Sequence, residues 1–310
     1  MRIIQPEAHI MPFNGDVLKH VERCGRIAYK SEDAITEDSY IRFIQNIIKR
    51  GHESVLEHGN YVFELHEVDY RETVMIYNGL NFDTYKEEGY SGRLKFSLHT
   101  GRPLISGNIR AWRDFIRVCN LDTMNIPSWV QAQFCNNPAF ADLGLEVPKE
   151  YGNYYVLTRE DLYPAEADIH WTETVHFICS RAISHELVRH RALSPTQESQ
   201  RYCNYSKGKF GGEITFIQPL WTLNSLPLEQ AWYTSMKDRE KTYMQRLEWG
   251  LQPQEAREEL PNSTKTELVM TGTIGEWKHF FNLRCPEDAH PEARRLAIPL
   301  RDEFTEKYAF

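Results

Sequence analysis

The stretch SHELVRHRALSPTQESQRY, residues 184–202, concentrates hydrogen-bond donors in an acidic chain. Its last fourteen residues hold three arginines, one histidine and two serines, whereas the whole chain has a formal net charge of −8. A solvated helix face would mix acids with bases, and here only Glu186 and Glu198 stand among the arginines. Because the arginine fork suits phosphate and carbonyl oxygens, the stretch, called here the RHR segment, predicts an anion site or a structural salt-bridge network.

The local geometry of the RHR segment follows from its spacing. Glu186, Arg189 and His190 are three and four residues apart, so we expect them to share one face of a helix. Pro195 should end that helix. An extended chain beyond it would direct Ser199 and Arg201 to the same side.

The composition indicates an ordered, globular chain. With 310 residues, 41% of them hydrophobic and 12% aromatic, we expect one elaborated domain. The negative charge argues against general nucleic-acid binding, because that depends on Lys and Arg. The first residues lack a signal-peptide core and no apolar run reaches about 18 residues, so we expect a cytoplasmic protein without a membrane span. Six widely spaced cysteines indicate reduced thiols, mostly in the core.

Several common active-site motifs are absent from the sequence. There is no GxGxxG, no GxxxxGK[ST] and no GxSxG, which removes the sequence support for a Rossmann site, a P-loop and a nucleophile-elbow hydrolase. The stretch HESVLEH has Leu56 where a zinc-protease helix needs its second histidine. His52 and His58, six residues apart, do not form a convincing metal-ligand pair.

Hydrophobic periodicity and turn residues predict a mixture of helices and strands. We expect helices over 37–50, 108–118, 228–250, 253–260, 274–284 and 291–304, and strands over 60–68 and 211–219. Residues 267–273 are apolar enough for a strand or a buried turn, and residues 171–194 begin as a strand or a buried segment and pass into the RHR helix. Residues 67–168 show scattered turns with one clear helix, which is typical of an insertion. No internal repeat is present.

Four sequence blocks in order carry a family resemblance. They are Arg-His-Arg, seven residues and Ser199; Gly51 to His58, which reads GHESVLEH; Ala256 to Pro261, which reads AREELP; and Asn282-Leu283-Arg284. Together they resemble the flavin-dependent thymidylate synthases. The resemblance covers about residues 15–65 and 170–300 and leaves out the insertion at 67–168.

The resemblance implies a fold and a reaction. The fold would be α+β, a mainly antiparallel sheet flanked by helices, in a homotetramer whose sites combine several subunits. The reaction would be reductive methylation of dUMP to dTMP by 5,10-methylenetetrahydrofolate, with FAD relaying hydride from NADPH. The partners would be these small molecules and other copies of the chain, without nucleic acid or membrane. We interpret the chain as a single domain, 1–310, with the insertion at about 67–168.

The resemblance also assigns site residues. Substrate-binding residues would be Glu186, Arg189, Ser199, Gln200, Arg201, Arg257 and Arg284. Flavin-binding residues would be His52, Ser54, Arg189, His190, Arg191, Gln197, Thr273 and His279. Arg284 would be catalytic, because a guanidinium at the uracil edge would stabilise negative charge on an ionised ring. The alternative is an arginine that only complements the helix dipole.

The sequence departs from the family pattern at two places and is also compatible with two rival functions. Many relatives have asparagine in place of Thr273, and the histidine that follows their NLR is displaced here to His290. One rival function is cysteine-dependent methylation of dUMP, for which Cys203 is the cysteine near the site. The other is a non-catalytic nucleotide- or RNA-binding protein that uses the same arginines.

Overall fold

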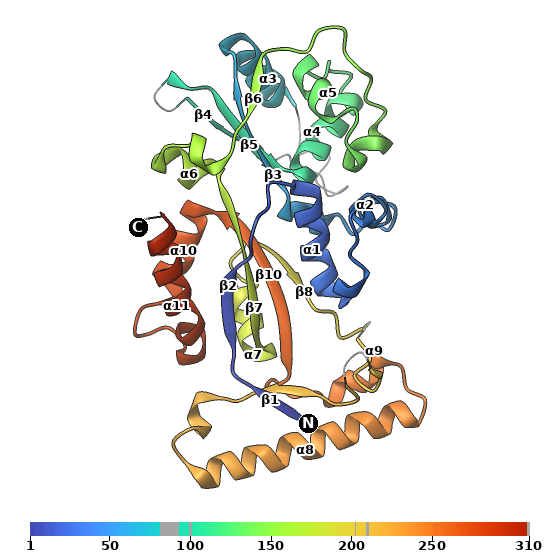
Figure 1. Cartoon of the computed structure of the whole chain (residues 1–310), viewed down its shortest axis with the longest axis vertical. Coiled ribbons are helices and arrows are strands. Elements are labelled where there is room, and N and C mark those ends of the chain that lie inside the picture. The colour runs from blue at the N-terminus through green and yellow to red at the C-terminus, as the bar shows by residue number, and fades with distance from the viewer. Residues whose placement is uncertain (81–92, 99–100, 202, 209–210, 309–310) are drawn as a thin grey trace.

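The structure is a computed structural model that describes residues 1–80, 93–98, 101–201, 203–208 and 211–308. The molecule is elongated, with two four-stranded antiparallel sheets one above the other and a long helix across the lower end (Figure 1). The described residues also form a two-stranded parallel pair. The expected α+β architecture with antiparallel sheets and flanking helices is therefore confirmed, although the expected single sheet is two sheets.

The lower of these sheets, called here the central sheet, is built around two long strands. Its order is β2 (Glu7–Ile10), β7 (Thr172–Ser180), β10 (Lys265–Thr273) and β8 (Ser194–Gln197). β7 and β10 pair antiparallel along their full length, from Lys265 opposite Ser180 to Thr273 opposite Thr172. β8 is an edge strand, which tolerates Pro195 because a proline there costs no central ladder bond.

Alternation along these strands divides the side chains between two faces. Phe177 and Met270 pack on one face with Trp277 under α7 (Arg181–Leu187), α10 (Ile274–Arg284) and α11 (Pro291–Tyr308). Val269 points to the other face and packs with Cys24 of α1 (Val17–Tyr29). Helices therefore cover both faces of the central sheet (Figure 1).

The prediction of scattered turns in the insertion is wrong, because strands of the insertion pair with β3 (Asn60–Leu65) in a second sheet. The order of the second sheet is β4 (Lys95–Ser97), β5 (Leu104–Asn108), β3 and β6 (Tyr154–Val156). The helices α3 (Glu67–Gly79), α4 (Ile109–Leu121) and α5 (Ser128–Phe134) surround it. Strands of three to five residues show little periodicity, which explains why β4, β5 and β6 were not predicted.

A seam of close contacts joins the second sheet to the central sheet. The helix α6 (Pro164–His170) packs on α10, where a Cβ at Gly275 would lie 2.7 Å from the Asp168 carbonyl oxygen. His170 is fully buried and hydrogen-bonds Ser97 and Ser106 of the second sheet, at 2.7 and 2.8 Å. The glycine at 275 is therefore needed for the two parts to approach.

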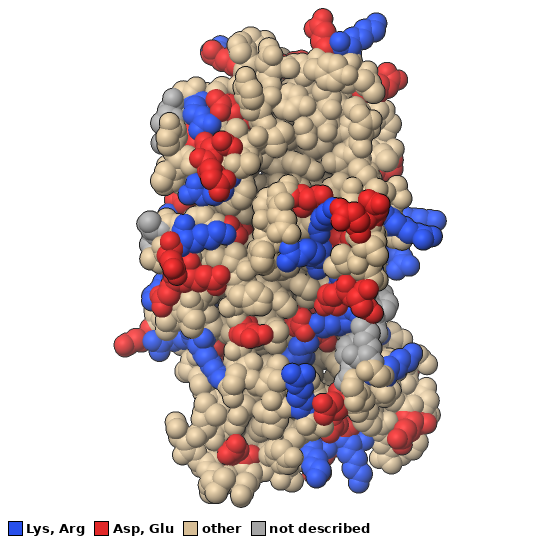
Figure 2. Space-filling model, viewed as in Figure 1, with Lys and Arg blue, Asp and Glu red and all other residues tan. Residues whose placement is uncertain are grey.

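The remaining elements agree with the sequence predictions in part. They are β1 (Arg2–Ile4), β9 (Thr215–Ile217), α2 (Ser39–Lys49), α8 (Leu226–Glu248) and α9 (Pro253–Ala256), with 3-10 turns η1 (Glu32–Ala34), η2 (Glu53–His58), η5 (Pro138–Leu143), η6 (Arg159–Asp161), η8 (Leu220–Thr222) and η9 (Arg257–Glu259). The strand over 211–219 and the helices over 37–50 and 228–250 are present, the helix over 253–260 is shorter than expected, and β1 and the 3-10 turns were not predicted. The parallel pair is β1 with β9. Lys and Arg are interspersed with Asp and Glu over the face in Figure 2. Among the described residues, no helix has the length and apolar character to cross a membrane.

Candidate functional site

The RHR segment leaves its helix earlier than its sequence spacing predicts. α7 ends at Leu187, and the next bonds are short 3-10 contacts, from Arg189 N to Glu186 O at 3.3 Å and from His190 N to Leu187 O at 3.1 Å. The prediction that the helix continues to Pro195 is therefore wrong. The cause is β8, because Ser194 to Gln197 pair with β10 and the chain must turn before it reaches them.

The turn brings Glu186 and His190 to Arg284 at the end of α10. Arg284 Nε donates to His190 Nε2 at 2.8 Å, Nη1 donates to Glu186 Oε2 at 2.7 Å, and Nη2 donates to the Glu186 carbonyl at 3.0 Å. The three residues to which the resemblance gives ligand-binding roles therefore lie together, although Glu186 and Arg284 are 98 positions apart in the sequence. A guanidinium held at three points has a fixed orientation, as electrostatic catalysis requires.

The charge state of His190 follows from these contacts. Burial lowers its pKa to about 4, and the nearby Arg284 and His279 act in the same direction. His190 Nε2 must accept the bond from Arg284, so the imidazole is neutral with its proton on Nδ1. The ring also packs against Phe280 with centroids 4.8 Å apart. His190 therefore positions Arg284, while Arg189 and Arg191 on either side are exposed.

The end of the RHR segment is a turn held against α1. Ser199 N donates to the Ala28 carbonyl at 3.3 Å, and the Ser199 carbonyl accepts from Cys203 N at 3.0 Å. Arg201 is exposed on this turn. Gln200 Nε2 is buried and has no hydrogen-bond partner among the described residues. The extended chain expected after Pro195 thus ends at Gln197, and Ser199 to Arg201 lie in a turn instead.

Two side chains of the RHR segment point into the protein. Gln197 Nε2 donates to Ser184 Oγ at 2.8 Å and to Thr266 Oγ1 at 3.1 Å. Glu198 is buried and accepts from Lys265 at 2.9 Å and from the Tyr205 hydroxyl at 3.0 Å. These contacts anchor β8. Part of the RHR segment therefore has a structural role, as the alternative to an anion site predicted.

The GHESVLEH block packs directly beside the RHR segment. Ser194 Oγ donates to Glu57 Oε2 at 2.7 Å, and Arg110 of α4 donates to Glu57 Oε1 at 2.6 Å. His52 Nδ1 is hydrogen-bonded to the Tyr29 hydroxyl at 2.6 Å and is half-buried, while Ser54 is exposed. Glu57 therefore joins β8 to the insertion.

A chain of buried hydrogen bonds runs from β8 through His58 to α1. His58 bonds Thr196 at 2.8 Å and Thr271 at 2.7 Å; Thr271 bonds Thr174 at 2.6 Å, and Thr174 bonds His20 at 2.8 Å. Burial lowers the pKa of His58 to about 3 and that of His20 to about 4. The network holds the GHESVLEH block in a fixed position against the central sheet.

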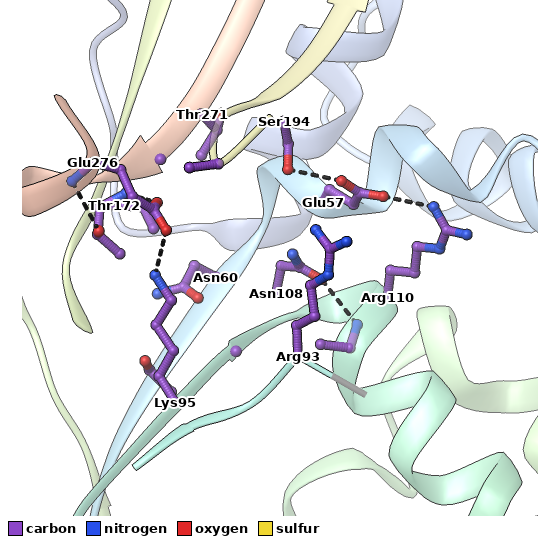
Figure 3. Close-up of a pocket in the computed structure, with 16 residues that line it drawn as sticks. Glu57, Asn60, Arg93, Lys95, Asn108, Arg110, Thr172, Ser194, Thr271 and Glu276 are labelled. Carbon is purple, nitrogen blue, oxygen red and sulfur yellow. Dashed lines mark hydrogen bonds and ion pairs between the residues drawn. The ribbon is translucent and has the colours of Figure 1, made fainter. Parts of the chain in front are cut away.

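A cavity of about 310 Å³ lies between the central sheet and the second sheet (Figure 3). Thr273 and Ser194 line it from the central sheet, and Ala192 lines it from the turn before β8. The Thr273 hydroxyl caps α10 by accepting from Glu276 N at 3.4 Å, while Thr273 N donates to Glu276 Oε2 at 2.7 Å. The side chain expected to bind flavin is thus committed to the helix cap. His279, one of the other expected flavin contacts, is exposed on α10.

Three predicted positions lie apart from this cluster. Arg257 is in η9, which packs with α8 at the lower end of the molecule (Figure 1). The Cys203 thiol is 1% exposed and packs with Tyr205 and Tyr243. His290, at the start of α11, is exposed and accepts from Glu292 N at 3.2 Å.

Sequence reasoning missed the polar residues that the insertion brings to the site. Arg93, Lys95 and Arg110 line the cavity opposite Glu57 and Glu276. No sequence motif marks these three cations. Arg110 pairs with Glu57, which is 53 positions away, and Lys95 pairs with Glu276, which is 181 positions away. Glu57 and His58 stand in the GHESVLEH block, so the block itself was the available signal.

Comparisons with known proteins agree with the RHR resemblance. Residues 168–308 match the family model described as "Thymidylate synthase complementing protein". The flavin-dependent thymidylate synthases of Pyrococcus abyssi, Pyrococcus furiosus and Pyrococcus horikoshii are 36%, 35% and 37% identical to this chain over 129 residues. That alignment is 42% of this chain and 52% of each relative.

The family model matches only the C-terminal part of the chain, residues 168–308. The chain spans about half the length of the curated relatives it matches. The resemblance is confirmed for the C-terminal part, which includes the RHR segment, the AREELP block and Arg284. The GHESVLEH block lies before residue 168 and outside the family match, although it packs beside the RHR segment.

Proposed function

We propose that this protein is a flavin-dependent thymidylate synthase, which converts dUMP to dTMP with 5,10-methylenetetrahydrofolate as carbon donor and NADPH as reductant. The proposal rests on the meeting of Glu186, His190 and Arg284 in a segment similar to that of enzymes with this name. FAD, when bound, would supply hydride transfer, which side chains cannot provide.

The chain's own residues would bind and orient the nucleotide. Arg284 is oriented by Glu186 and His190, and a guanidinium in that place would stabilise negative charge on the uracil ring. Ser199, Gln200 and Arg201 on the turn after β8 would bind the nucleotide. The buried Gln200 Nε2, which has no acceptor among the described residues, supports this role because a ligand oxygen would satisfy it.

The donor set of the RHR segment also fits a flavin. Arg189 and Arg191 are exposed on either side of a neutral histidine, and arginine forks suit phosphate and ring carbonyl oxygens. His52 and Ser54 on the adjacent block, together with Gln197 and His279, would add further contacts to the flavin. The commitment of Thr273 to the cap of α10 makes it the weakest of the flavin contacts.

The cysteine-dependent alternative is disfavoured by burial. Cys203 is 1% exposed among aromatic side chains, so its thiol could not attack a ring at the surface turn without local unfolding. The RNA-binding alternative is disfavoured by the net charge of −8 and by the mixed charges of the face in Figure 2.

Assembly is part of the proposal. Arg257 lies with α8, apart from the cluster around Arg284, and a homotetramer would allow a neighbouring subunit to bring it to the nucleotide phosphate. We propose the chain as one domain with the insertion at 67–168 built into it, in the cytoplasm. Measurement of the mass of the purified protein in solution tests the tetramer.

The test of function is the visible spectrum of the purified protein during turnover. We expect flavin absorbance that bleaches with NADPH and returns only when dUMP and methylenetetrahydrofolate are both added without oxygen. Arg284→Ala should lower dTMP formation about 100-fold or more while flavin remains bound. Arg301→Ala, a matched change on α11 where Arg301 pairs with Asp302, should leave turnover unchanged. A protein that binds no flavin would refute the proposal.

A further inference from the structure

The cavity between the two sheets has walls of different origin. One wall comes from the GHESVLEH block and the central sheet with α10, and includes Glu57, Ser194 and Glu276. The opposite wall comes from the insertion and includes Arg93 and Arg110 (Figure 3). A ligand there would touch the GHESVLEH block, the central sheet and the insertion at the same time, so the insertion can contribute to binding.

The charged side chains of the cavity are also divided between the walls. Arg93, Lys95 and Arg110 come from the insertion, whereas the carboxylates Glu57 and Glu276 come from the other wall. Three cations against two carboxylates leave the cavity with a formal excess of positive charge. An acidic chain thus has a local site in which an anion is favoured.

Ion pairs hold two of these cations at the cavity wall. Lys95 Nζ lies 2.7 Å from Glu276 Oε1, and Arg110 Nη1 lies 2.6 Å from Glu57 Oε1. Both cations remain partly exposed, with side-chain exposures of 36% and 31%. Arg93 is exposed, and its side chain points toward the pair of Glu57 and Arg110 (Figure 3). Arg93 and Arg110 thus both line this cavity.

The position of the cavity connects it to the RHR segment. Ala192, which follows the exposed Arg191, lies on its wall together with Thr273. The Thr273 hydroxyl already accepts from Glu276 N, so this wall offers a ligand neutral hydroxyl groups and, among the described residues, no cation of its own. The insertion offers the cationic groups that this wall lacks.

We propose that the insertion forms a diphosphate-binding wall, in which Arg93 and Arg110, with Lys95, bind the diphosphate of a dinucleotide cofactor that also contacts the RHR segment. The inference rests on the proposed function for the cofactor's identity. Paired arginine forks suit a group with two adjacent phosphates better than a single carboxylate. The dinucleotide is either the flavin or the nicotinamide cofactor, which share this diphosphate.

The test compares ligands that differ in their phosphates. Dissociation constants of FAD, FMN, riboflavin and NADPH are measured on the whole protein by fluorescence titration, for the wild type, the double variant Arg93→Gln with Arg110→Gln, and the single Arg93→Gln. The single variant keeps the bond between Arg110 and Glu57, so it folds even if the double variant does not. Arg71→Gln, an insertion arginine on α3 with 77% side-chain exposure, is the matched control.

We expect the double variant to weaken FAD binding about 10-fold or more, the single variant to weaken it by a smaller factor, and riboflavin binding and the control to be unchanged. A loss confined to NADPH would support the same wall with the nicotinamide cofactor as its ligand. Unchanged affinity for both dinucleotides in correctly folded variants would overturn the inference while leaving the proposed function intact. A wild type that binds NADPH but no flavin would refute the proposed function alone, and one that binds neither would refute both.

Discussion

The central sheet and the second sheet each have four strands and an apolar core with aromatic side chains, and the central sheet also has a buried hydrogen-bonded chain beside it. Beside the central sheet, His58 connects Thr196 and Thr271 in a buried hydrogen-bonded chain. Under the second sheet, Phe63 and Trp112 pack edge to face in an aromatic core. A polar interior needs particular donors in particular places, whereas an aromatic core can be filled in many ways. His58 accordingly lies in the recognisable GHESVLEH block, whereas the residues packed around Phe63 and Trp112 show no motif.

The two sheets nevertheless share apolar packing. The cluster that contains Phe115 of α4 also contains Leu18 of α1 and Ile44 of α2. α1 in turn packs on the central sheet through Cys24 and Val269. The insertion is thus part of the core of the block that precedes it, and we expect the whole chain to unfold as one unit.

The largest effect should come from truncating a buried phenylalanine in each sheet. Phe63 of β3 and Phe177 of β7 are both fully buried on interior strands. Changing either to alanine should lower the free energy of unfolding by about 3–5 kcal/mol, through lost burial and the cavity left behind. Urea denaturation followed by tryptophan fluorescence and by far-UV circular dichroism measures the change.

The shape of the transition decides whether the sheets are independent. If they form one unit, both variants will shift a single transition that is the same for both probes. A second transition in Phe63→Ala, with the first unmoved, would show that the insertion folds separately. Phe63→Leu and Phe177→Leu provide milder versions if the alanine variants are insoluble.

Sequence reasoning was most reliable where one element carries its own periodicity. The helix predicted over 274–284 is α10, Ile274–Arg284, and of the strand or buried turn predicted over 267–273 the strand is present, within β10. It was wrong where a distant partner decides the outcome. α7 stops at Leu187 because β8 must pair with β10, which no spacing within residues 184–202 reveals.

The same limit applies to buried charges and to the site. Arg113 is fully buried in α4 with its guanidinium on Asp142 at 2.7 Å, and its sequence neighbours show only an amphipathic helix. Glu186 and Arg284 are 98 positions apart, so only the family resemblance could link them. The residues of the cavity wall, such as Lys95, lacked both periodicity and motif.

A smaller effect is expected on the stability of the protein in acid. It depends on one buried histidine at each sheet. Burial lowers the pKa of His58 to about 3 and that of His170 to about 4, whereas an unfolded histidine titrates near 6.5. Between those values the unfolded chain binds a proton that the folded chain does not. Stability is therefore lost as the pH falls below about 6.5, by up to about 1.4 kcal/mol per pH unit for each histidine.

The variants His58→Gln and His170→Gln should each reduce this dependence on pH. Both variants will be less stable at pH 7, so the quantity to compare is the slope of unfolding free energy between about pH 6.5 and 4.5. Equal reductions would indicate that both sheets exclude protons equally well. A wild-type slope that His58→Gln leaves unchanged would contradict the neutral, buried state of that ring.

The smallest effect should come from the ion pairs that cross the seam. Lys95 with Glu276, at 2.7 Å, and Lys278 with Asp168, at 2.8 Å, are both partly exposed, so each should contribute about 0.2–1 kcal/mol. Double-mutant cycles with Lys→Met and with Glu276→Gln or Asp168→Asn isolate each coupling energy from the role of Glu276 as a helix cap. Couplings that fall with added salt are expected. A coupling above about 2 kcal/mol would show that charge, rather than the buried packing at α1 and Gly275, holds the two sheets together.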